Sequence, residues 1–296
     1  MLGVRPFKKS QAGCSSAWLA LTLTMYSHHS QPALRKTLKN AGAADAGSNV
    51  LFWKQITMSS IPIPASQITT IAFDADDTLW HNETIFRFTE ERFAKLLSEV
   101  MDSEPLMDRL LATERRNLKF YGYGIKGFTL SMIETALDVT EGRASPHIIS
   151  EILAAGREML THPVETLPGV REAIEKLSER FRVMVITKGD LFDQERKVAE
   201  SGLAELFHTV EIVSEKTEET YSDLFSRHGT GPEQAVMVGN SLKSDVIPAL
   251  QAGAWGVYVP YQITWAMEKA DEPQECERYR CVKSLTEFVE LLAVRA

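Results

Sequence analysis

Cysteine is scarce in this chain of 296 residues, which contains only Cys14, Cys276 and Cys281. A sparse, odd set of cysteines cannot form the dense disulfide framework of a small secreted domain, so a reducing compartment fits better. No further Cys or His pair lies close to Cys276 and Cys281 in sequence, so the spacing of a zinc site is missing. We predict unpaired thiols, no zinc, and a cytoplasmic protein.

Long apolar runs are also missing. The run AWLALTLTMY, residues 17–26, is too short to span a bilayer, although the basic residues before it loosely resemble a signal or transit peptide. A start assigned too early, with the true beginning near Met58, explains the same composition. We predict that residues 1–60 are a disordered leader or a mis-assigned start that carries no chemistry. The alternative is a working transit peptide and an organellar location.

Basic charge is in short supply over most of the chain. Of 32 basic and 40 acidic residues, seven basic and one acidic lie in residues 1–57, which leaves 25 against 39 in residues 58–296. This excess of acidic residues argues against nucleic acid as a partner, because a phosphate backbone binds best to a basic protein surface. A hydrophobic content of 44% still allows a sizeable buried core. A small phosphorylated ligand remains possible if its charge is met locally.

The chain from residue 67 onward alternates apolar strand-length runs with helical patterns. The runs are ITTIAF (68–73), RVMVIT (182–187), VEIV (210–213), AVMVG (235–239) and WGVYV (255–259). Strands that alternate with helices at about thirty residues per unit predict a parallel sheet covered on both faces. We therefore expect an α/β fold with a Rossmann-like, doubly wound parallel core.

Residues 83–164 interrupt this alternation with apolar positions at helical spacing and no convincing strand. They predict a helical subdomain inserted after the first strand. The expected organisation is a catalytic core from 61–82 and 165–296 with a helical cap at 83–164.

Polar side chains follow successive predicted strands. They are Asp74 and Asp76, then Thr187 and Lys188, then Lys216, and then Asn240 and Asp245. Ligands of such sheets bind beyond the carboxyl ends of the strands. Each residue alone could be an ordinary helix cap, turn or surface residue. Their order at one edge of the sheet favours a shared site.

Phosphoryl transfer to a carboxylate accounts for these residue types. Asp74 would attack phosphorus, and Asp76 would protonate the leaving oxygen and then activate water. Thr187 would donate to a phosphoryl oxygen, and Lys216 would offset the charge of the phosphate and Asp74. Asp245 and Asp74 would hold Mg²⁺, which prefers oxygen ligands. Asp77 has no assigned role beyond a hydrogen-bonding acid in the loop.

The motifs DADDT (74–78), Thr187, Lys216 and GNSLKSD (239–245) resemble, in order, the four motifs of the haloacid dehalogenase superfamily. The resemblance covers residues 67 to about 260. It implies a Rossmann-like core, Mg²⁺ dependence, a metal bond from the main-chain carbonyl of Asp76, and a cap of the first type over small substrates. It also places Asn240 among the metal ligands, where relatives often carry Asp.

Asp76 resembles the second acid of the phosphatase branch, which dehalogenases lack. We therefore predict a Mg²⁺-dependent phosphatase of a small phosphorylated metabolite, with no nucleic acid or membrane partner. A phosphomutase of the same superfamily and a non-catalytic phosphoprotein-binding relative are the alternatives. In that family specificity would come from the cap and from the loop after the first motif, which makes His81, Asn82 and the 121–126 turn candidate substrate contacts. Lys188 is a further candidate beside Thr187 and Lys216. The identity of the substrate stays open.

Overall fold

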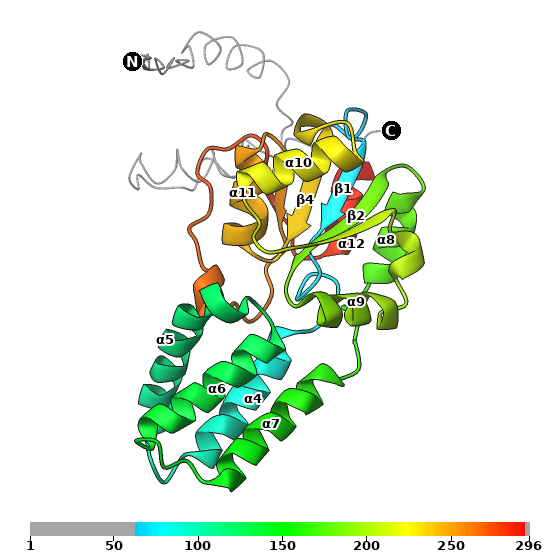
Figure 1. The fold of residues 1–296 in the computed structure, drawn as a ribbon. Coiled ribbons are helices and arrows are strands. Elements are labelled where there is room, and N and C mark those ends of the chain that lie inside the picture. Colours follow the sequence, from blue (N-terminus) through cyan, green and yellow to red (C-terminus); the bar gives the residue numbers. More distant parts are fainter. Residues whose placement is uncertain (1–62, 294–296) are drawn as a thin grey trace, which may run out of the picture. The chain divides into compact units, whose positions relative to one another are not determined.

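The computed structural model describes residues 63–293, and their centre is one parallel sheet (Figure 1). The strands lie in the order β3-β2-β1-β4-β5-β6. Their bounds are Thr70–Phe73 (β1), Arg182–Lys188 (β2), Thr209–Val213 (β3), Ala235–Gly239 (β4), Trp255–Tyr258 (β5) and Tyr279–Cys281 (β6). Strand β1 is central, since Phe73 lies beside Val185 of β2 and Val238 of β4. The residues that follow β1, β2 and β4 therefore meet at one edge.

Helices cover both faces of the sheet, as the continuously apolar strands require. The helices α8 (Val170–Ser178), α9 (Leu191–Glu200) and α12 (Leu285–Ala293) contribute to the core on one face, where Phe73 meets Phe288 edge-on. The helices α10 (Glu218–His228) and α11 (Ile247–Gln251) cover the other face, where Tyr221 and Phe225 pack against the strands. The predicted Rossmann-like, doubly wound α/β fold is confirmed.

Four helices leave the sheet after β1 and form a separate helical insertion (Figure 1). They are α4 (Glu83–Leu96), α5 (Ser103–Tyr121), α6 (Ile125–Val139) and α7 (Pro146–Leu160). Apolar side chains from all four, among them Phe93, Leu110, Phe128 and Ile152, form a core of their own. The insertion is therefore an independently packed body attached to the sheet edge.

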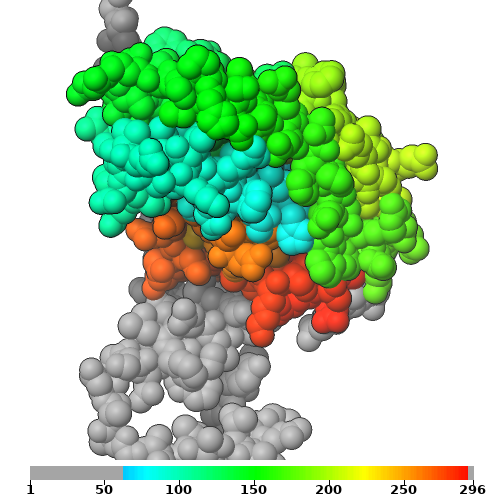
Figure 2. All heavy atoms as spheres, turned by 90° about the horizontal axis from the view of Figure 1, so that it is seen from below, coloured from blue at the N-terminus to red at the C-terminus, as the bar shows by residue number. Residues whose placement is uncertain are grey.

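The insertion touches the core through the turn before α6 and through the connection between β5 and β6. In Figure 2 this connection, residues 259–278, lies in orange against the cyan and green insertion. It contains a short 3₁₀ helix, η4 (Ala266–Glu268), and the ring of Trp265 meets the ring of Tyr123 edge-on at 6.2 Å. Exposed links join the turn to the core as well, since Lys126 pairs with Asp190 at 2.9 Å.

The sheet differs from the sequence prediction in one detail. Strand β6 was not predicted, because its three residues are too few to show a pattern. The predicted leader at 1–60 lies outside the described residues. Within residues 63–293, no helix has the length and apolarity needed to cross a bilayer.

Candidate active site

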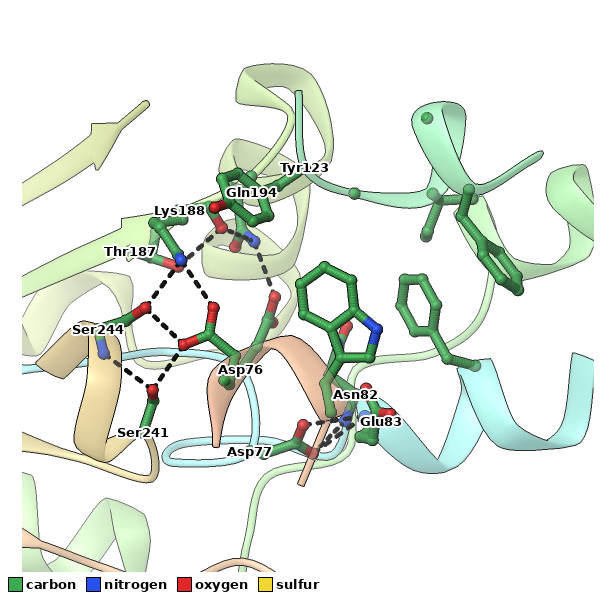
Figure 3. A pocket seen from close by; sticks show the side chains of 18 of the residues that line it. Asp76, Asp77, Asn82, Glu83, Tyr123, Thr187, Lys188, Gln194, Ser241 and Ser244 are labelled. Atoms are coloured by element: carbon green, nitrogen blue, oxygen red, sulfur yellow. Dashed lines mark hydrogen bonds and ion pairs between the residues drawn. The ribbon is translucent and has the colours of Figure 1, made fainter. Parts of the chain in front are cut away.

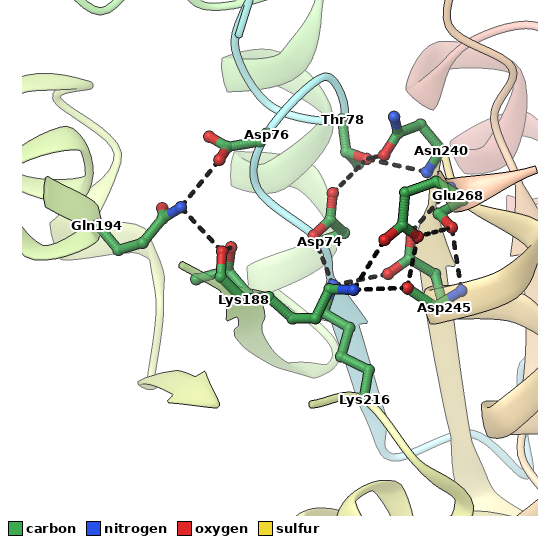
Figure 4. A network of polar contacts seen from close by, with 12 residues as sticks. Asp74, Asp76, Thr78, Lys188, Gln194, Lys216, Asn240, Asp245 and Glu268 are labelled. Atoms are coloured by element: carbon green, nitrogen blue, oxygen red, sulfur yellow. Dashed lines mark hydrogen bonds and ion pairs between the residues drawn. The ribbon is translucent and has the colours of Figure 1, made fainter. Parts of the chain in front are cut away.

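Asp74 is the first residue after β1 and lies buried at the centre of the sheet edge. Its main-chain N–H donates to the carbonyl of Val238, which continues the β1–β4 ladder. Its two carboxylate oxygens have different partners: Oδ1 accepts from Lys216 Nζ at 2.5 Å, and Oδ2 accepts from Thr78 Oγ1 at 3.1 Å. Figure 4 shows this arrangement. The carboxylate is thereby fixed in orientation by a cation and a hydroxyl.

Lys216 also binds Asp245, with Nζ 2.6 Å from Oδ1, so one buried amine joins two acids from different elements. Burial opposes its charge, but Asp245 and Asp74 together hold the pKa of Lys216 well above its usual value. Burial and repulsion from Asp74 raise the pKa of Asp245. Gly239 makes room for this acid, because a Cβ there would lie 2.2 Å from Asp245 Oδ2. Only glycine at the end of β4 allows the carboxylate to fold back.

Oxygen atoms converge beside Asp74 in a way that fits a hard cation. One side-chain amide atom of Asn240 lies 3.1 Å from Asp74 Oδ2 and 3.2 Å from the main-chain carbonyl oxygen of Asp76. As a nitrogen this atom donates to both oxygens and to the Thr78 hydroxyl. As an oxygen it accepts from that hydroxyl and otherwise faces the two acceptor oxygens, an arrangement that a bound cation would explain. Such a set of oxygens is what Mg²⁺ binds. Within residues 63–293 no cluster of three His, Cys, Asp or Glu side chains is arranged for a metal, so the donors here are mixed.

Asp76 points away from Asp74 and is held by helix α9. Lys197 Nζ lies 2.7 and 2.8 Å from its two carboxylate oxygens, Gln194 Nε2 donates at 2.8 Å, and the indole N–H of Trp80 donates at 2.7 Å. Burial would raise the pKa of Asp76, but the charge of Lys197 and its hydrogen bonds lower it. The hydrogen bonds from Gln194 and Trp80 lower it further. Asp76 is therefore an oriented carboxylate.

Thr187 and Lys188 end β2 beside this centre. Thr187 is buried, and both residues line one cavity with Asp74, Asp76 and Lys216. Lys188 Nζ donates to Ser244 Oγ and to Glu268 Oε1, each at 2.8 Å, and lies 4.1 Å from the centre of the Tyr123 ring. The cavity has a volume of about 170 Å³ and extends into the insertion (Figure 3).

Comparison with known proteins agrees with this geometry. A family model described as haloacid dehalogenase-like hydrolase matches residues 68–253. The chain belongs to this family. A haloacid dehalogenase-like family hydrolase from Xanthomonas campestris has 46% identity and a TM-score of 0.68, covering 77% of this chain and 91% of that one. The matched residues include the sheet edge described above.

More distant relatives of this hydrolase differ in chemistry. The glyceraldehyde 3-phosphate phosphatase of Methanopyrus kandleri is 24% identical over 194 residues, covering 63% of this chain and 81% of that protein. The L-2-haloacid dehalogenase of Xanthobacter autotrophicus shares the fold with a TM-score of 0.54 and 16% identity, over 77% of this chain and all of that one. Fold likeness alone therefore does not choose between phosphoric esters and halogenated acids.

The structure of this haloacid dehalogenase-like hydrolase brings together most of the residues expected from its sequence. Those that line the cavity are Asp74, Asp76, Thr187, Lys188, Lys216, Asn240 and Asp245. His81 is not among them, because its Nδ1 is hydrogen-bonded to the Tyr261 hydroxyl at 2.6 Å on another part of the surface. A substrate contact for His81 stays a prediction that this geometry does not support. The 121–126 turn does reach the cavity, through Tyr123 and its flanking glycines.

Several residues of this hydrolase's site were missed from the sequence. Gln194 and Lys197 lie three apart on α9 and are buried with Asp193, a polar helical face that resembles a solvated one. No sequence signal could have found them, because a lysine and a glutamine at helical spacing look the same on a solvated helical face. Glu268 gave no signal, because it lies in an irregular connection.

Proposed function

We propose that this haloacid dehalogenase-like hydrolase is a Mg²⁺-dependent phosphatase of small phosphomonoesters that works through a covalent aspartyl-phosphate on Asp74. The observation that carries the proposal is the fixed carboxylate of Asp74, which lies between Lys216 and Thr78 while a second acid, Asp76, is held two residues further on. A nucleophile with a neighbouring acid/base is what a two-step phosphoryl transfer requires.

In the proposed reaction Asp74 Oδ attacks phosphorus and the bond to the leaving alcohol breaks. Asp76, a carboxylate beside Lys197 in the free protein, would first take up a proton from solvent or from the monoanionic ester. It would give this proton to the leaving oxygen and afterwards take one from the water that hydrolyses the aspartyl-phosphate. Lys216 offsets the negative charge of Asp74 and the phosphoryl group, and the Thr187 hydroxyl orients a phosphoryl oxygen. Lys188 lines the same cavity and is our further candidate for a substrate contact.

The metal would be held by Asp74, the Asp76 carbonyl and Asn240, with Asp245 as the remaining candidate ligand. Asp245 is engaged with Lys216 and with the main-chain N–H of Ser241 at 2.9 Å, so its part in metal binding is the least supported. When bound, Mg²⁺ supplies positive charge that draws the phosphoryl group to Asp74. The convergent oxygens beside Asp74 support this assignment.

Asp76 is also the reason to favour phosphoric esters over halogenated acids. A halide leaves without a proton, whereas an alkoxide leaving group needs one. An acid positioned by Lys197, Gln194 and Trp80 would have no use in dehalogenation. We further propose that residues 83–164 form a cap over the cavity, because Tyr123 and its neighbours reach the core residues there.

We propose a cytoplasmic location for this phosphatase. The described cysteines, Cys276 and Cys281, are both free thiols, which supports a reducing compartment.

The decisive experiment is release of inorganic phosphate from a panel of small phosphomonoesters, with Mg²⁺ and with EDTA. Asp74→Asn should lower kcat by roughly 10³-fold or more, since it removes the nucleophile. Asp108→Asn, a matched change at an exposed aspartate of α5, should leave the rate unchanged. Full turnover by Asp74→Asn would refute the nucleophile, and an unaltered rate in EDTA would refute the metal. Accumulation of an isomer without free phosphate would instead identify a phosphomutase.

A further inference from the structure

The lysine that follows Thr187 is already neutralised inside the cavity. Lys188 is only 11% exposed, and its amine contacts Ser244, Glu268 and the face of Tyr123, while the mostly exposed Glu215 lies further off at 3.9 Å. Glu268 comes from η4, far along the chain, and reaches across to pair with it at 2.8 Å (Figure 4). The amine therefore has an anionic partner before any ligand arrives.

Glu268 is held in this place by more than Lys188. Its Oε2 accepts from the hydroxyl of Ser241 at 2.6 Å and from the hydroxyl of Ser244 at 2.5 Å. Burial would raise the pKa of Glu268, but Lys188 and these two hydroxyls lower it, so the group is an ionised carboxylate. The amine of Lys188 and the hydroxyls of Ser241 and Ser244 could bind an anionic ligand, but they bind the carboxylate of Glu268 instead.

The other cations of the cavity are paired too. Among the described residues that line it there are three lysines, no arginine and nine acidic residues. Lys197 is taken by Asp76 and Lys216 by Asp74 and Asp245. The end inside the insertion carries Glu83, Glu90 and Glu114 with Asn117 and Ser131, so it offers carboxyl, amide and hydroxyl groups but no cation.

We infer that Glu268 is a specificity-determining residue: by occupying Lys188, Ser241 and Ser244 it restricts this site to phosphomonoesters whose alcohol is uncharged or cationic and bears no second acid. This rests on the proposed phosphatase function and narrows its substrate class. A carboxylate or second phosphate on the leaving group would find no free cation in the cavity, because Glu268 already pairs with Lys188, and a charge left unpaired there costs binding free energy. Hydroxyl or amino groups would find acceptors instead.

The test uses three phosphomonoesters with the same two-carbon skeleton: phosphoglycolate, 2-hydroxyethyl phosphate and ethanolamine phosphate. For the wild type, kcat/KM for the last two should exceed that for phosphoglycolate by about tenfold or more. Glu268→Gln removes the charge and keeps the shape, so it should raise kcat/KM for phosphoglycolate by about tenfold, mainly by lowering KM. Glu268→Asp keeps the charge and should retain the wild-type preference.

Asp190→Asn is the matched control. It also turns one acid near the cavity into an amide, but it frees Lys126, which does not line the cavity, and asparagine still caps α9. It should leave the preference unaltered. If a compound is not hydrolysed, its Ki against p-nitrophenyl phosphate hydrolysis replaces KM.

Three results would overturn the inference: phosphoglycolate as the best wild-type substrate, an unchanged preference in Glu268→Gln, or an equal shift in Asp190→Asn. Failure of the proposed function looks different. In that case no phosphomonoester is hydrolysed, or Asp74→Asn retains turnover. Hydrolysis that depends on Asp74 but favours phosphoglycolate would refute the specificity inference alone.

Discussion

At the scale of single residues, the aspartates of the DADDT motif have separate surroundings. Asp74 is held by Lys216 and Thr78. Asp76 is held by Lys197 on helix α9, and Asp77 by main-chain N–H groups. Three carboxylates within four positions would repel one another, and each is offset by its own partner. In the proposed mechanism Lys197 is a positioning residue, since it orients the carboxylate of Asp76.

Lys197→Met should lower kcat by about 10- to 100-fold while KM changes little, because the acid/base loses its orientation and substrate binding does not. Steady-state kinetics of phosphate release measure both constants. Lys197→Arg should restore much of kcat, since a guanidinium can also bind both carboxylate oxygens. Lys176→Met, at an exposed lysine of α8, is the control. A pure KM effect in Lys197→Met would contradict the positioning role.

At the scale of elements, helix α4 begins with the help of a residue outside it. Asp77 accepts from the N–H groups of Asn82 at 2.9 Å and of Glu83 at 3.0 and 3.1 Å, although Asn82 itself makes no capping bond. Asp77 has a positive φ of 62°, a conformation that aspartate and asparagine tolerate better than other side chains. The third aspartate of the motif therefore anchors the insertion to the loop after β1.

Asp77→Ala should destabilise the protein by about 1–2 kcal/mol, because it removes a helix cap and strains the left-handed backbone. Asp77→Asn, which keeps an oxygen acceptor, should cost less. The measurement is the free energy of unfolding in urea. Asp102→Ala is the matched control, because Asp102 precedes α5 without a capping hydrogen bond. Equal losses in Asp77→Ala and Asp102→Ala would contradict the capping role.

At the scale of the whole molecule, the excess of acidic charge has a consequence for stability. Burial and the nearby charge of Glu90 raise the pKa of Glu114 from its ordinary 4.5 to about 8. The folded protein therefore binds this proton more tightly than the unfolded chain does. Stability must fall as the pH rises from 4.5 toward 8, because ionisation of Glu114 then opposes folding.

Glu114→Gln should consequently raise the free energy of unfolding by on the order of 1 kcal/mol near pH 9, after allowance for partial solvent screening, and have little effect near pH 4. Urea unfolding at a series of pH values gives the difference directly. Glu99→Gln changes an exposed glutamate after α4 and serves as the control. A gain in stability that is the same at every pH would contradict the assigned cause.

The sequence predicted the sheet well, because continuous apolar runs such as AVMVG suit only buried parallel strands, and their order fixes where the polar residues gather. It therefore pointed to Asp74, Lys216 and Asp245, which the structure brings into contact. It could not reveal Lys197 or Glu268. The partners of these two residues depend on tertiary packing. The sequence of a charged helical face, such as that of Lys197, or of an irregular connection, such as that of Glu268, does not show what it packs against. His81 shows the converse, since nearness in sequence to the motif did not place it in the cavity.

The loop from Asp74 to the start of α4 is a short tether with a capping acid in its middle. Asp76 and Asp77 are adjacent on it, one turned toward α9 and the other bound to the first turn of α4. In the proposed reaction, a swing of the helical insertion about this tether would reach the proposed acid/base, Asp76, within one residue. If the proposed function holds, closure over the substrate and delivery of the proton are coupled, and an ester too large for the insertion to close over should be hydrolysed slowly.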